Sequence, residues 1–269
     1  MNTTNSAATR GGPEEKDGGL DGNHGGLDGK AALVTGGSRG IGAAIALRLA
    51  RAGADVAVTY VNSKDGAEEV VRAVRALGRR AVALRADSAD AAEAAGAVER
   101  TVEALGRLDV LVNNAGVGVV APLGDLALAD VDRVLAVNVR GVFLTSQAAA
   151  ARMTSGSRII TIGTCMTQHV PGPGGTLYNT SKAALVGLTR ALARELGERG
   201  ITANIVHPGP TDTDMNPADG PQAPGQAAMT ALGRYGTADE VAATVAHLAG
   251  PDAAYVSGAE FSVDGGYAA

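Results

Sequence analysis

The sequence predicts one α/β domain, built on a doubly wound parallel sheet of about seven strands with helices on both faces. Short apolar runs recur along the chain without period-two alternation, as expected for parallel strands that are covered on both sides. Ala-rich stretches of helical length separate these runs. No internal repeat or linker is visible, and 269 residues suffice for one such domain but are few for two.

The expected elements alternate from strand to helix, beginning at Lys30. Their lengths match those of βα units, which connect through right-handed crossovers. Strands are predicted at Lys30–Thr35, Asp55–Tyr60, Arg80–Leu84, Leu108–Val112, Arg158–Ile162, Thr202–Val206 and Glu260–Val263. Helices are predicted near residues 40–53, 64–78, 89–105, 128–152, 177–198 and 238–249.

The first 27 residues differ from the rest of the chain in composition. They are rich in Gly, Asn and Asp and show no apolar periodicity, so they cannot bury enough surface to offset the entropy of ordering. We predict a disordered N-terminal tail over residues 1–27 and the folded domain over residues 28–269. A passive extension is favoured over a regulatory arm.

Composition and charge argue against several classes of function. A formal net charge of −5 and an aromatic content of 3% without Trp do not suit a nucleic-acid binder. The single cysteine, Cys165, allows no intramolecular disulfide. No apolar run approaches the roughly 20 residues of a membrane helix, and the N-terminus lacks a signal-peptide pattern, so we expect a cytoplasmic protein. No metal site is predicted, because ligand spacing is absent among the four histidines, His24, His169, His207 and His247.

A glycine-rich turn, Thr35–Gly42, joins the first predicted strand to the first predicted helix. Such a turn lets backbone N–H groups and the helix N-terminus approach a pyrophosphate. Gly36 suits the tight turn, Gly40 the close approach of the phosphates, and Gly42 the close packing of helix on strand. This placement predicts a dinucleotide site, with the remaining loop contacts from Ser38, Arg39 and Ile41.

The end of the second strand distinguishes NADP(H) from NAD(H). A carboxylate there favours the free ribose of NAD, whereas a basic and hydroxyl-rich corner favours the 2′-phosphate of NADP. The sequence offers Tyr60, Asn62 and Ser63 but no acid before Asp65, and Arg39 lies in the nearby loop. NADP(H) is therefore the preferred cofactor, and NAD(H) stays open because Arg39 also suits an enzyme that accepts both. Ser63 also fits a helix N-cap, and Arg39 a solvated surface charge.

Tyr178 and Lys182 lie four residues apart, so a helix places both on one face. A close cation favours the phenolate and lowers the pKa of a tyrosine. Such a phenol can donate a proton to a carbonyl that is being reduced, or accept one from an alcohol. A pair at this spacing usually lies on a helix surface, but here it follows a glycine-rich nucleotide loop. We therefore predict proton chemistry at Tyr178.

Five landmarks follow one another between Lys30 and the C-terminus. They are Thr35–Gly42, Asn113-Asn114-Ala115-Gly116, Asn138, the pair Tyr178 and Lys182, and Pro208-Gly209. In this order they resemble the short-chain dehydrogenase/reductase family in its compact, one-domain form. The resemblance implies a Rossmann-type fold and hydride transfer between a nicotinamide nucleotide and a carbonyl or alcohol.

The resemblance also implies a role for each landmark. Tyr178 would act as general acid/base, and Lys182 would hold the nicotinamide ribose and lower the pKa of the tyrosine. Asn138 would hold a water that relays protons to Lys182; its alternative is a buried polar group bonded to backbone. Residues 113–116 would stabilise the sheet and flank the cofactor. The further cofactor contacts are then expected from Asp87, Ser88, Asn114, Ala115, Gly116, Pro208, Gly209, Thr211 and Thr213.

One position departs from the family pattern. The family places a catalytic serine at the end of the fifth strand, where this sequence has Thr164. Its hydroxyl can still donate to the substrate oxygen, although the extra methyl stiffens χ1 and narrows the pocket. Thr167 is a weaker substitute. Cys165 has no neighbour that would activate a thiolate, so we expect an inert buried thiol.

Substrate choice is expected to depend on residues 166–177 and on the stretch 214–226. The second stretch is rich in Pro, Ala and Gly and predicts a short flexible lid. By resemblance to β-ketoacyl and carbonyl reductases, we expect a ketone, β-ketoester or β-ketoacyl group to be reduced to a secondary alcohol. A sugar or polyol dehydrogenase, and a nucleotide-binding regulatory protein with little turnover, stay open. The family also implies a homotetramer, formed through the long helices that carry Asn138 and Tyr178.

Overall fold

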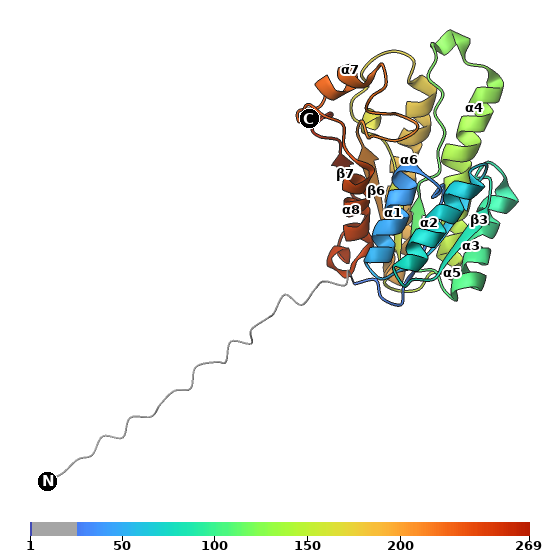
Figure 1. Cartoon of the computed structure of the whole chain (residues 1–269), viewed down its shortest axis with the longest axis vertical. Helices are drawn as coiled ribbons and strands as arrows, with labels where there is room; N and C mark the ends of the chain where they lie inside the picture. The colour runs from blue at the N-terminus through green and yellow to red at the C-terminus, as the bar shows by residue number, and fades with distance from the viewer. Residues whose placement is uncertain (2–25) are drawn as a thin grey trace.

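The computed structural model describes Met1 and residues 26–269. Seven parallel strands form one sheet in the order β3-β2-β1-β4-β5-β6-β7, which confirms the predicted doubly wound fold (Figure 1). The order reverses direction between β1 and β4, and in such sheets ligands bind at the carboxyl ends of the strands next to this switch point. The strands are β1 Ala31–Val34, β2 Asp55–Tyr60, β3 Ala81–Arg85, β4 Val110–Asn113, β5 Arg158–Ile162, β6 Thr202–Pro208 and β7 Glu260–Val263.

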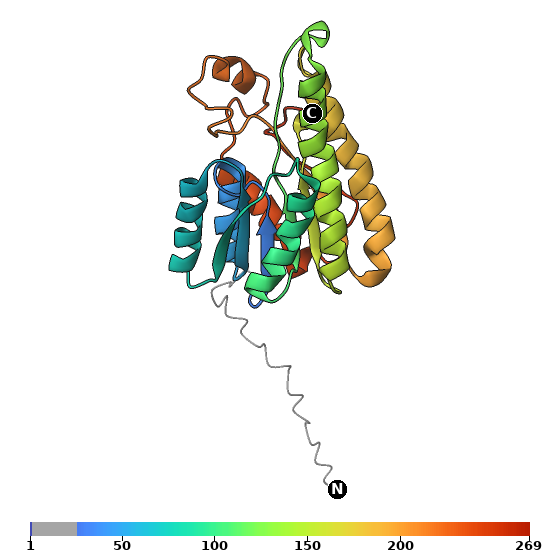
Figure 2. The same cartoon turned by 90° about the vertical axis from the view of Figure 1, so that its right-hand side faces the viewer.

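Helices cover both faces of the sheet, and most of them match the predicted ranges to within a few residues. They are α1 Gly40–Arg51, α2 Lys64–Ala76, α3 Ala91–Leu105, α4 Leu128–Leu135, α5 Val142–Arg152, α6 Thr176–Leu196, α7 Ala223–Ala228 and α8 Ala238–Ala249. Single turns η1 Leu123–Asp125, η3 Cys165–Thr167, η4 Gly197–Arg199 and η5 Pro251–Ala253 connect some of them. Figure 2 shows α4 and α5 in line as one long rod, which lies beside α6 and extends beyond the sheet.

Burial on both faces explains why the strands lack alternation in the sequence. In β1, Ala32 and Val34 pack with α1, α2 and α8, whereas Leu33 packs with α3, α5 and α6. Neighbouring residues of a strand point to opposite faces, so both sets must be apolar here. The two apolar layers hold the carboxyl ends of the strands in fixed positions, and the loops that follow these ends carry the predicted site.

The folded domain begins before residue 28. Leu27 is 2% exposed and belongs to the apolar cluster of α1 and α8. Its backbone N–H donates to the carbonyl of Ala52 at 3.0 Å. The predicted boundary after residue 27 is therefore wrong at this residue, because burial of the leucine side chain stabilises the segment despite its glycine neighbours. The rest of the predicted tail, residues 2–25, lies outside the described residues.

The predicted helix 128–152 is one continuous run whose middle, η2 Ala136–Gly141, winds as a π-helix. By length and composition this run is long and apolar enough to cross a membrane, so the expectation that no such stretch exists is wrong. The run packs along α3 and α6 and buries residues such as Val134 and Ala149 inside the domain. Part of its apolar character thus reflects its place in the core of the α/β domain, while other apolar side chains of the run, such as Phe143, are exposed. Asn138 lies in the π-helical turn, an irregularity that is frequent at functional sites.

Candidate active site at the carboxyl ends of the strands

The glycine-rich loop after β1 is held by the neighbouring strand ends. Gly36 and Gly40 have positive φ values of 64° and 54°, which favour glycine. The side-chain amide of Asn114 donates to the carbonyls of Thr35 at 2.9 Å and of Gly36 at 3.1 Å. A Cβ at Gly36 would lie only 2.9 Å from the Cα of Ala115. The loop and residues 114–115 therefore form one packed unit.

The corner beside β2 brings several predicted cofactor residues together. Ser38 and Ser63 both lie against Gly66. A Cβ added to this glycine would lie 2.6 Å from Ser63 Oγ and 2.8 Å from the Ser38 carbonyl oxygen. Ser63 is the N-cap residue of α2, as the alternative interpretation expects, although its hydroxyl makes no cap hydrogen bond within the described chain. The side chain of Arg39 is 64% exposed and pairs loosely with Asp214 at 3.8 Å. Tyr60 at the end of β2 is half-buried, and Asn62 is exposed.

Asp87 and Ser88 follow β3 at the same edge of the sheet. One carboxylate oxygen of Asp87 accepts from the Ala89 N–H at 2.9 Å, and the other accepts from Arg133 at 3.1 Å. Burial raises the pKa of this carboxyl, but the Ala89 and Arg133 hydrogen bonds outweigh burial and lower the pKa overall. The Asp87 side chain is 28% exposed, so it stays accessible from the loop side.

The loop after β6 lies on the other side of the glycine loop. Gly209 donates its N–H to the Val263 carbonyl at 3.0 Å, and Thr211 Oγ1 donates to the Gly209 carbonyl at 2.9 Å. The side chain of Thr213 comes within 3.4 Å of the position that a Cβ on Gly40 would occupy. The structure therefore brings both predicted cofactor loops into contact, and Pro208 ends β6 beside them.

Lys182 is buried on the face of α6 that points toward β5. It is 4% exposed, and its Nζ donates to the Ile162 carbonyl at 2.8 Å. Burial lowers its pKa to about 8. A Cβ at Gly116 would lie 3.3 Å from Nζ and 3.5 Å from Asn138 Oδ1. Gly116 thus leaves both polar groups open toward the cofactor side, and two Nζ donors stay available for a ligand.

Asn138 is fully buried and bonds to the backbone of Val117. Its Oδ1 accepts from the Val117 N–H at 2.9 Å, and its Nδ2 donates to the Val117 carbonyl at 2.8 Å and to Ser181 Oγ at 3.0 Å. Ser181 in turn donates to the Tyr178 carbonyl at 2.7 Å. This pattern matches the structural interpretation of Asn138, and it also connects the π-helical turn to the start of α6.

Tyr178 lies beside Lys182, but the predicted effect of the lysine on its pKa is wrong. Burial raises the pKa of Tyr178 to about 12, and a hydrogen bond between Thr164 and the phenol opposes this rise only in part. Lys182 Nζ is 6.0 Å from the centre of the tyrosine ring and donates to Ile162 instead. A charge at that distance does not compensate for the burial of a phenolate. Tyr178 is therefore a protonated phenol at neutral pH.

Thr164 occupies the position that the family gives to serine, directly after β5. It is 7% exposed, and its Oγ1 accepts from the Met166 N–H at 3.4 Å, which leaves its own proton free to donate. Thr167 Oγ1 donates its proton to the Thr164 carbonyl at 2.9 Å, so Thr167 is less suited than Thr164 to replace the family serine. Cys165 is buried as expected, and burial raises the pKa of its thiol to about 12.

A buried histidine, which the sequence analysis did not assign to the site, accepts a hydrogen bond from the backbone of Thr164. His207 in β6 is 0% exposed; its Nδ1 accepts from the Thr164 N–H at 3.2 Å, and its Nε2 contacts Glu260 at 3.1 Å. Glu260 also accepts from Arg190 on α6 at 2.6 Å. Because Nδ1 is an acceptor, the proton lies on Nε2 and is donated to Glu260. In the sequence, His207 comes immediately before Pro208-Gly209, and this position is the signal that could have placed the histidine near the site.

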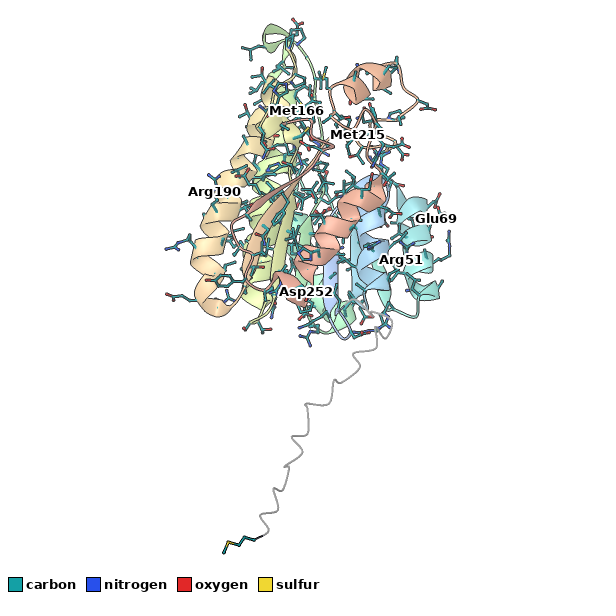
Figure 3. The ribbon with its side chains drawn as sticks, turned by 90° about the vertical axis from the view of Figure 1, so that its left-hand side faces the viewer. Arg51, Glu69, Met166, Arg190, Met215 and Asp252 are labelled. Carbon is teal, nitrogen blue, oxygen red and sulfur yellow. The ribbon has the colours of Figure 1, made fainter. Side chains whose placement is uncertain are left out.

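The stretch 214–226, predicted as a flexible lid, contains the short helix α7 and a local polar cluster. Asn216 Nδ2 donates to Gln226 Oε1 at 2.9 Å, and the Tyr235 hydroxyl donates to the same oxygen at 3.0 Å. The stretch is therefore more structured than its composition suggests. Met166 and Met215, labelled in Figure 3, come from the two segments that were expected to govern substrate choice.

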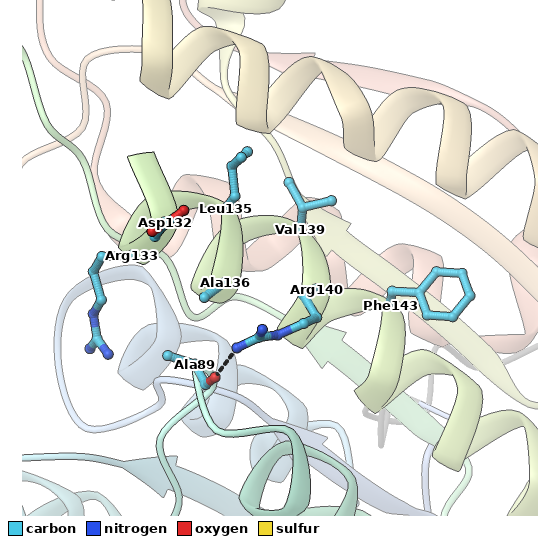
Figure 4. A pocket seen from close by; sticks show the side chains of 8 residues that line it. All are labelled: Ala89, Asp132, Arg133, Leu135, Ala136, Val139, Arg140 and Phe143. Atoms are coloured by element: carbon cyan, nitrogen blue, oxygen red, sulfur yellow. Dashed lines mark hydrogen bonds between the residues drawn. The ribbon is translucent and has the colours of Figure 1, made fainter. Parts of the chain in front are cut away.

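A surface hollow lies away from Tyr178, Thr164 and Lys182. Its volume is about 780 Å³, and it follows the outer face of α4, η2 and α5. Figure 4 shows Leu135, Val139 and Phe143 along this face, with Arg140 donating to the Ala89 carbonyl. Within the described part of the chain, no group of three or more His, Cys, Asp or Glu side chains could hold a metal ion.

Together, the fold and the site define a nucleotide-binding oxidoreductase of the Rossmann type. A family model described as enoyl-(acyl carrier protein) reductase matches residues 36–268. The chain is 43% identical over 240 residues to a cyclic-di-GMP-binding biofilm dispersal mediator protein of Escherichia coli K12, covering 89% of this chain and 98% of the relative. It is 41% identical over 240 residues to a 3-oxoacyl-(acyl-carrier-protein) reductase of Synechocystis, covering 88% of this chain and 96% of the relative.

A solved structure matches as well. A short-chain dehydrogenase from Burkholderia cenocepacia J2315 in complex with NADP is 56% identical, with a TM-score of 0.89 and coverage of 90% of this chain and 99% of that one. The chain belongs to the short-chain dehydrogenase/reductase family.

Proposed function

We propose that this protein is an NADP(H)-dependent reductase that converts a small ketone, β-ketoester or β-ketoacyl group to a secondary alcohol. The observation that carries the proposal is that Tyr178 bonds to Thr164 and that Lys182 lies against Gly116, close in sequence to Asn114, which holds the glycine loop. A carbonyl oxygen placed between the phenol and the threonine hydroxyl would receive hydrogen bonds from both. When bound, the nicotinamide nucleotide supplies the hydride.

The residues around the glycine loop fit a dinucleotide. Gly36 and Gly40 keep the main chain open to a pyrophosphate, and the N-terminus of α1 points at the same place. Ser38, Ser63 and the exposed guanidinium of Arg39 form a corner that suits a 2′-phosphate. The related Burkholderia structure, which holds NADP, supports this preference. Asp87 and Ser88 would contact the adenine, and Thr211 and Thr213 the nicotinamide end.

The high pKa of Tyr178 suits reduction. A phenol with a pKa of about 12 is protonated at neutral pH, so it is ready to donate. The oxygen of the reduced carbonyl becomes far more basic than the carbonyl itself, so transfer of the phenolic proton to it is downhill. Thr164 would donate a second hydrogen bond to the same oxygen and hold it in place during this transfer.

Lys182 and Asn138 would then restore the proton of Tyr178. Lys182 has a pKa of about 8, so it both carries and releases a proton near neutral pH. Its Nζ and Asn138 Oδ1 flank Gly116, and Asn138 Oδ1 retains an acceptor site beyond its bond to Val117. A water between these groups would pass protons from solvent to Lys182. The remaining Nζ donors would hold the nicotinamide ribose.

An assay of cofactor oxidation tests the reductase proposal. Ethyl acetoacetate, an N-acetylcysteamine β-ketothioester and two cyclic ketones are each offered with NADPH and with NADH, and sugars and polyols are offered with NADP⁺. We expect turnover of the β-keto substrates with NADPH at a higher kcat/KM than with NADH. Turnover confined to sugars or polyols would replace the proposal by the polyol dehydrogenase alternative.

A nucleotide-binding regulatory role is the second candidate. It is favoured by the relative whose name describes cyclic-di-GMP binding, and by the threonine at the serine position. The two candidates separate in one comparison, in which cyclic-di-GMP binding is measured by calorimetry and ketone turnover is measured on the same sample. Tight binding of cyclic-di-GMP without turnover of any ketone would favour the regulatory role.

We further propose that the protein is a cytoplasmic homotetramer. The outer face of α4, η2 and α5 exposes Leu128 at 73%, Leu135 at 39% and Phe143 at 51%, which is costly for a face that stays in water. Contacts between copies through this face and α6 would cover these side chains. Light scattering after size exclusion tests the assembly, and a Phe143→Glu variant should shift it toward smaller species.

A further inference from the structure

A small cavity lies at the opposite end of the sheet from the catalytic residues. Its volume is about 190 Å³, and its lining includes Lys30, Asp109, Arg158 and Pro251. Lys30 immediately precedes β1, Asp109 immediately precedes β4, and Arg158 begins β5, three neighbouring strands of the sheet. Asp252, labelled in Figure 3, marks this end of the molecule. The residues that line this cavity have no assigned role in the proposed reductase reaction.

Arg158 is an unusual residue for such a position. It is 6% exposed, and none of the ion pairs among residues 26–269 includes it. Its Nη1 donates to the carbonyls of Gly156 at 2.9 Å and Ser157 at 3.2 Å, whereas its Nε is buried and has no partner in the described chain. Burial lowers the pKa of its guanidinium. A buried arginine without a counter-charge is costly unless something compensates for it.

The carboxylate in the same cavity does not supply that compensation. Asp109 accepts from Arg107 at 2.6 Å with each of its oxygens, from the Ala31 N–H at 2.9 Å and from Lys30 Nζ at 3.3 Å. These donors use most of its acceptor positions. Two cations, Lys30 and Arg158, line the cavity with a single carboxylate, and Arg107 from outside the lining already pairs with that carboxylate, so the cavity has a surplus of positive charge.

We propose that this cavity binds a small oxyanion, such as a phosphate or carboxylate group, independently of the cofactor and substrate. Arg158 Nη1 already donates to two carbonyls and Nε is buried, so Nη2 is the group that offers donors to an anion, and Lys30 adds a mobile point charge at the rim. The volume accommodates an oxyanion group with a short organic remainder. The bound anion would provide the counter-charge that Arg158 lacks within the described chain.

The site is separate from the phosphate-binding glycine loop. Strand β4 has four residues, so about 13 Å of strand lies between its amino end, at the cavity, and its carboxyl end, at the catalytic side. An experiment must nevertheless exclude phosphate bound at the glycine loop. Saturating NADP⁺ serves this purpose in every sample.

The test measures inorganic phosphate binding by titration calorimetry and by the unfolding temperature, at constant ionic strength kept with chloride. The wild-type protein with NADP⁺ should show saturable binding and a rise of a few degrees in Tm. Arg158→Gln should lose the response, and Lys30→Gln should weaken binding about tenfold. Arg152→Gln is the matched control, since Arg152 is exposed on α5 and pairs with Glu99; its response should equal that of the wild type. Acetate in a parallel titration shows whether a carboxylate occupies the same site.

Two results would overturn the proposal. The first is a wild-type protein without saturable binding of either anion. The second is a response that persists in Lys30→Gln and Arg158→Gln alike, which would place the anion elsewhere, the glycine loop included. If Arg158→Gln fails to fold, Lys30→Gln still decides, because its side chain is 35% exposed at the rim and is expected to leave the core intact.

Discussion

Around the glycine loop the chain presents main-chain groups, small residues and exposed polar side chains, whereas around Tyr178 it buries its polar side chains. Arg39 is 64% exposed and Asn62 lies at the surface, but Asn138, Lys182 and His207 are each at most 4% exposed. Exposed contacts contribute modest and separable amounts to binding, while buried polar networks depend on every member. We therefore expect changes in the cofactor half to alter affinity, and changes in the catalytic half to alter turnover.

Apart from Tyr178, Thr164 should give the largest of the effects that separate the two halves. Thr164→Val keeps the shape but removes the hydroxyl, so kcat should fall about 100-fold while the dissociation constant of NADPH stays within about twofold. Thr164→Ser is the conservative control and should retain at least the wild-type rate, because it restores the family residue without the methyl. A Thr164→Val enzyme with near-normal kcat would show that the hydroxyl has no part in the reaction.

The pH dependence of reduction probes Lys182. Its pKa of about 8 lies below the ordinary value because of burial, so the ammonium loses its proton as the pH rises past 8. If protonated Lys182 is required, kcat/KM for ketone reduction should be flat below pH 8 and fall about tenfold per pH unit above it. Tyr178, with a pKa of about 12, should not contribute to this profile below pH 11. A flat profile up to pH 10 would contradict the assigned role of the lysine.

His207 should have a smaller effect, transmitted through Thr164. His207→Leu removes the acceptor for the Thr164 N–H and the contact to Glu260 Oε2, so kcat should fall about tenfold and stability by about 1–3 kcal/mol. His207→Asn places an acceptor near Nδ1 and should restore most of the rate. NADPH affinity serves as the control, and a fall in affinity as large as the fall in kcat would indicate general disruption of the site.

Arg39 should show the smallest effect, confined to one cofactor. Arg39→Ser removes an exposed cation from the corner of Ser38 and Ser63, so the KM for NADPH should rise about tenfold while that for NADH stays unchanged. The ratio of kcat/KM values for the two cofactors is the measurement. Equal changes for NADPH and NADH would place Arg39 outside the 2′-phosphate site.

The cofactor half could be predicted from the sequence more completely than the catalytic half. Glycines such as Gly36 and Gly40 are required by local backbone geometry, so their spacing in the sequence is enough to predict the turn that they form. The bonds of His207 to Thr164 and of Asn138 to Val117 join residues 43 and 21 positions apart, and no local pattern encodes them. The π-helical turn around Asn138 could not be predicted either, because no local sequence pattern indicates it.

The incorrect expectation for Tyr178 has a similar origin. Spacing alone brings the lysine near the phenol and suggests a lowered pKa. Burial depends on the whole fold, however, and here it outweighs a cation at 6.0 Å from the ring. Leu27 shows the same limit, because its glycine-rich surroundings gave no sign that its side chain reaches the core.

Tyr178→Phe tests the central claim most directly, because it removes one oxygen atom from the ring that is proposed to donate the proton. Turnover of the best β-keto substrate with NADPH and the dissociation constant of NADPH are measured on the same preparation. We predict that kcat falls about 1,000-fold or more while the dissociation constant changes less than about twofold. A variant that keeps more than a tenth of the wild-type kcat would contradict the account.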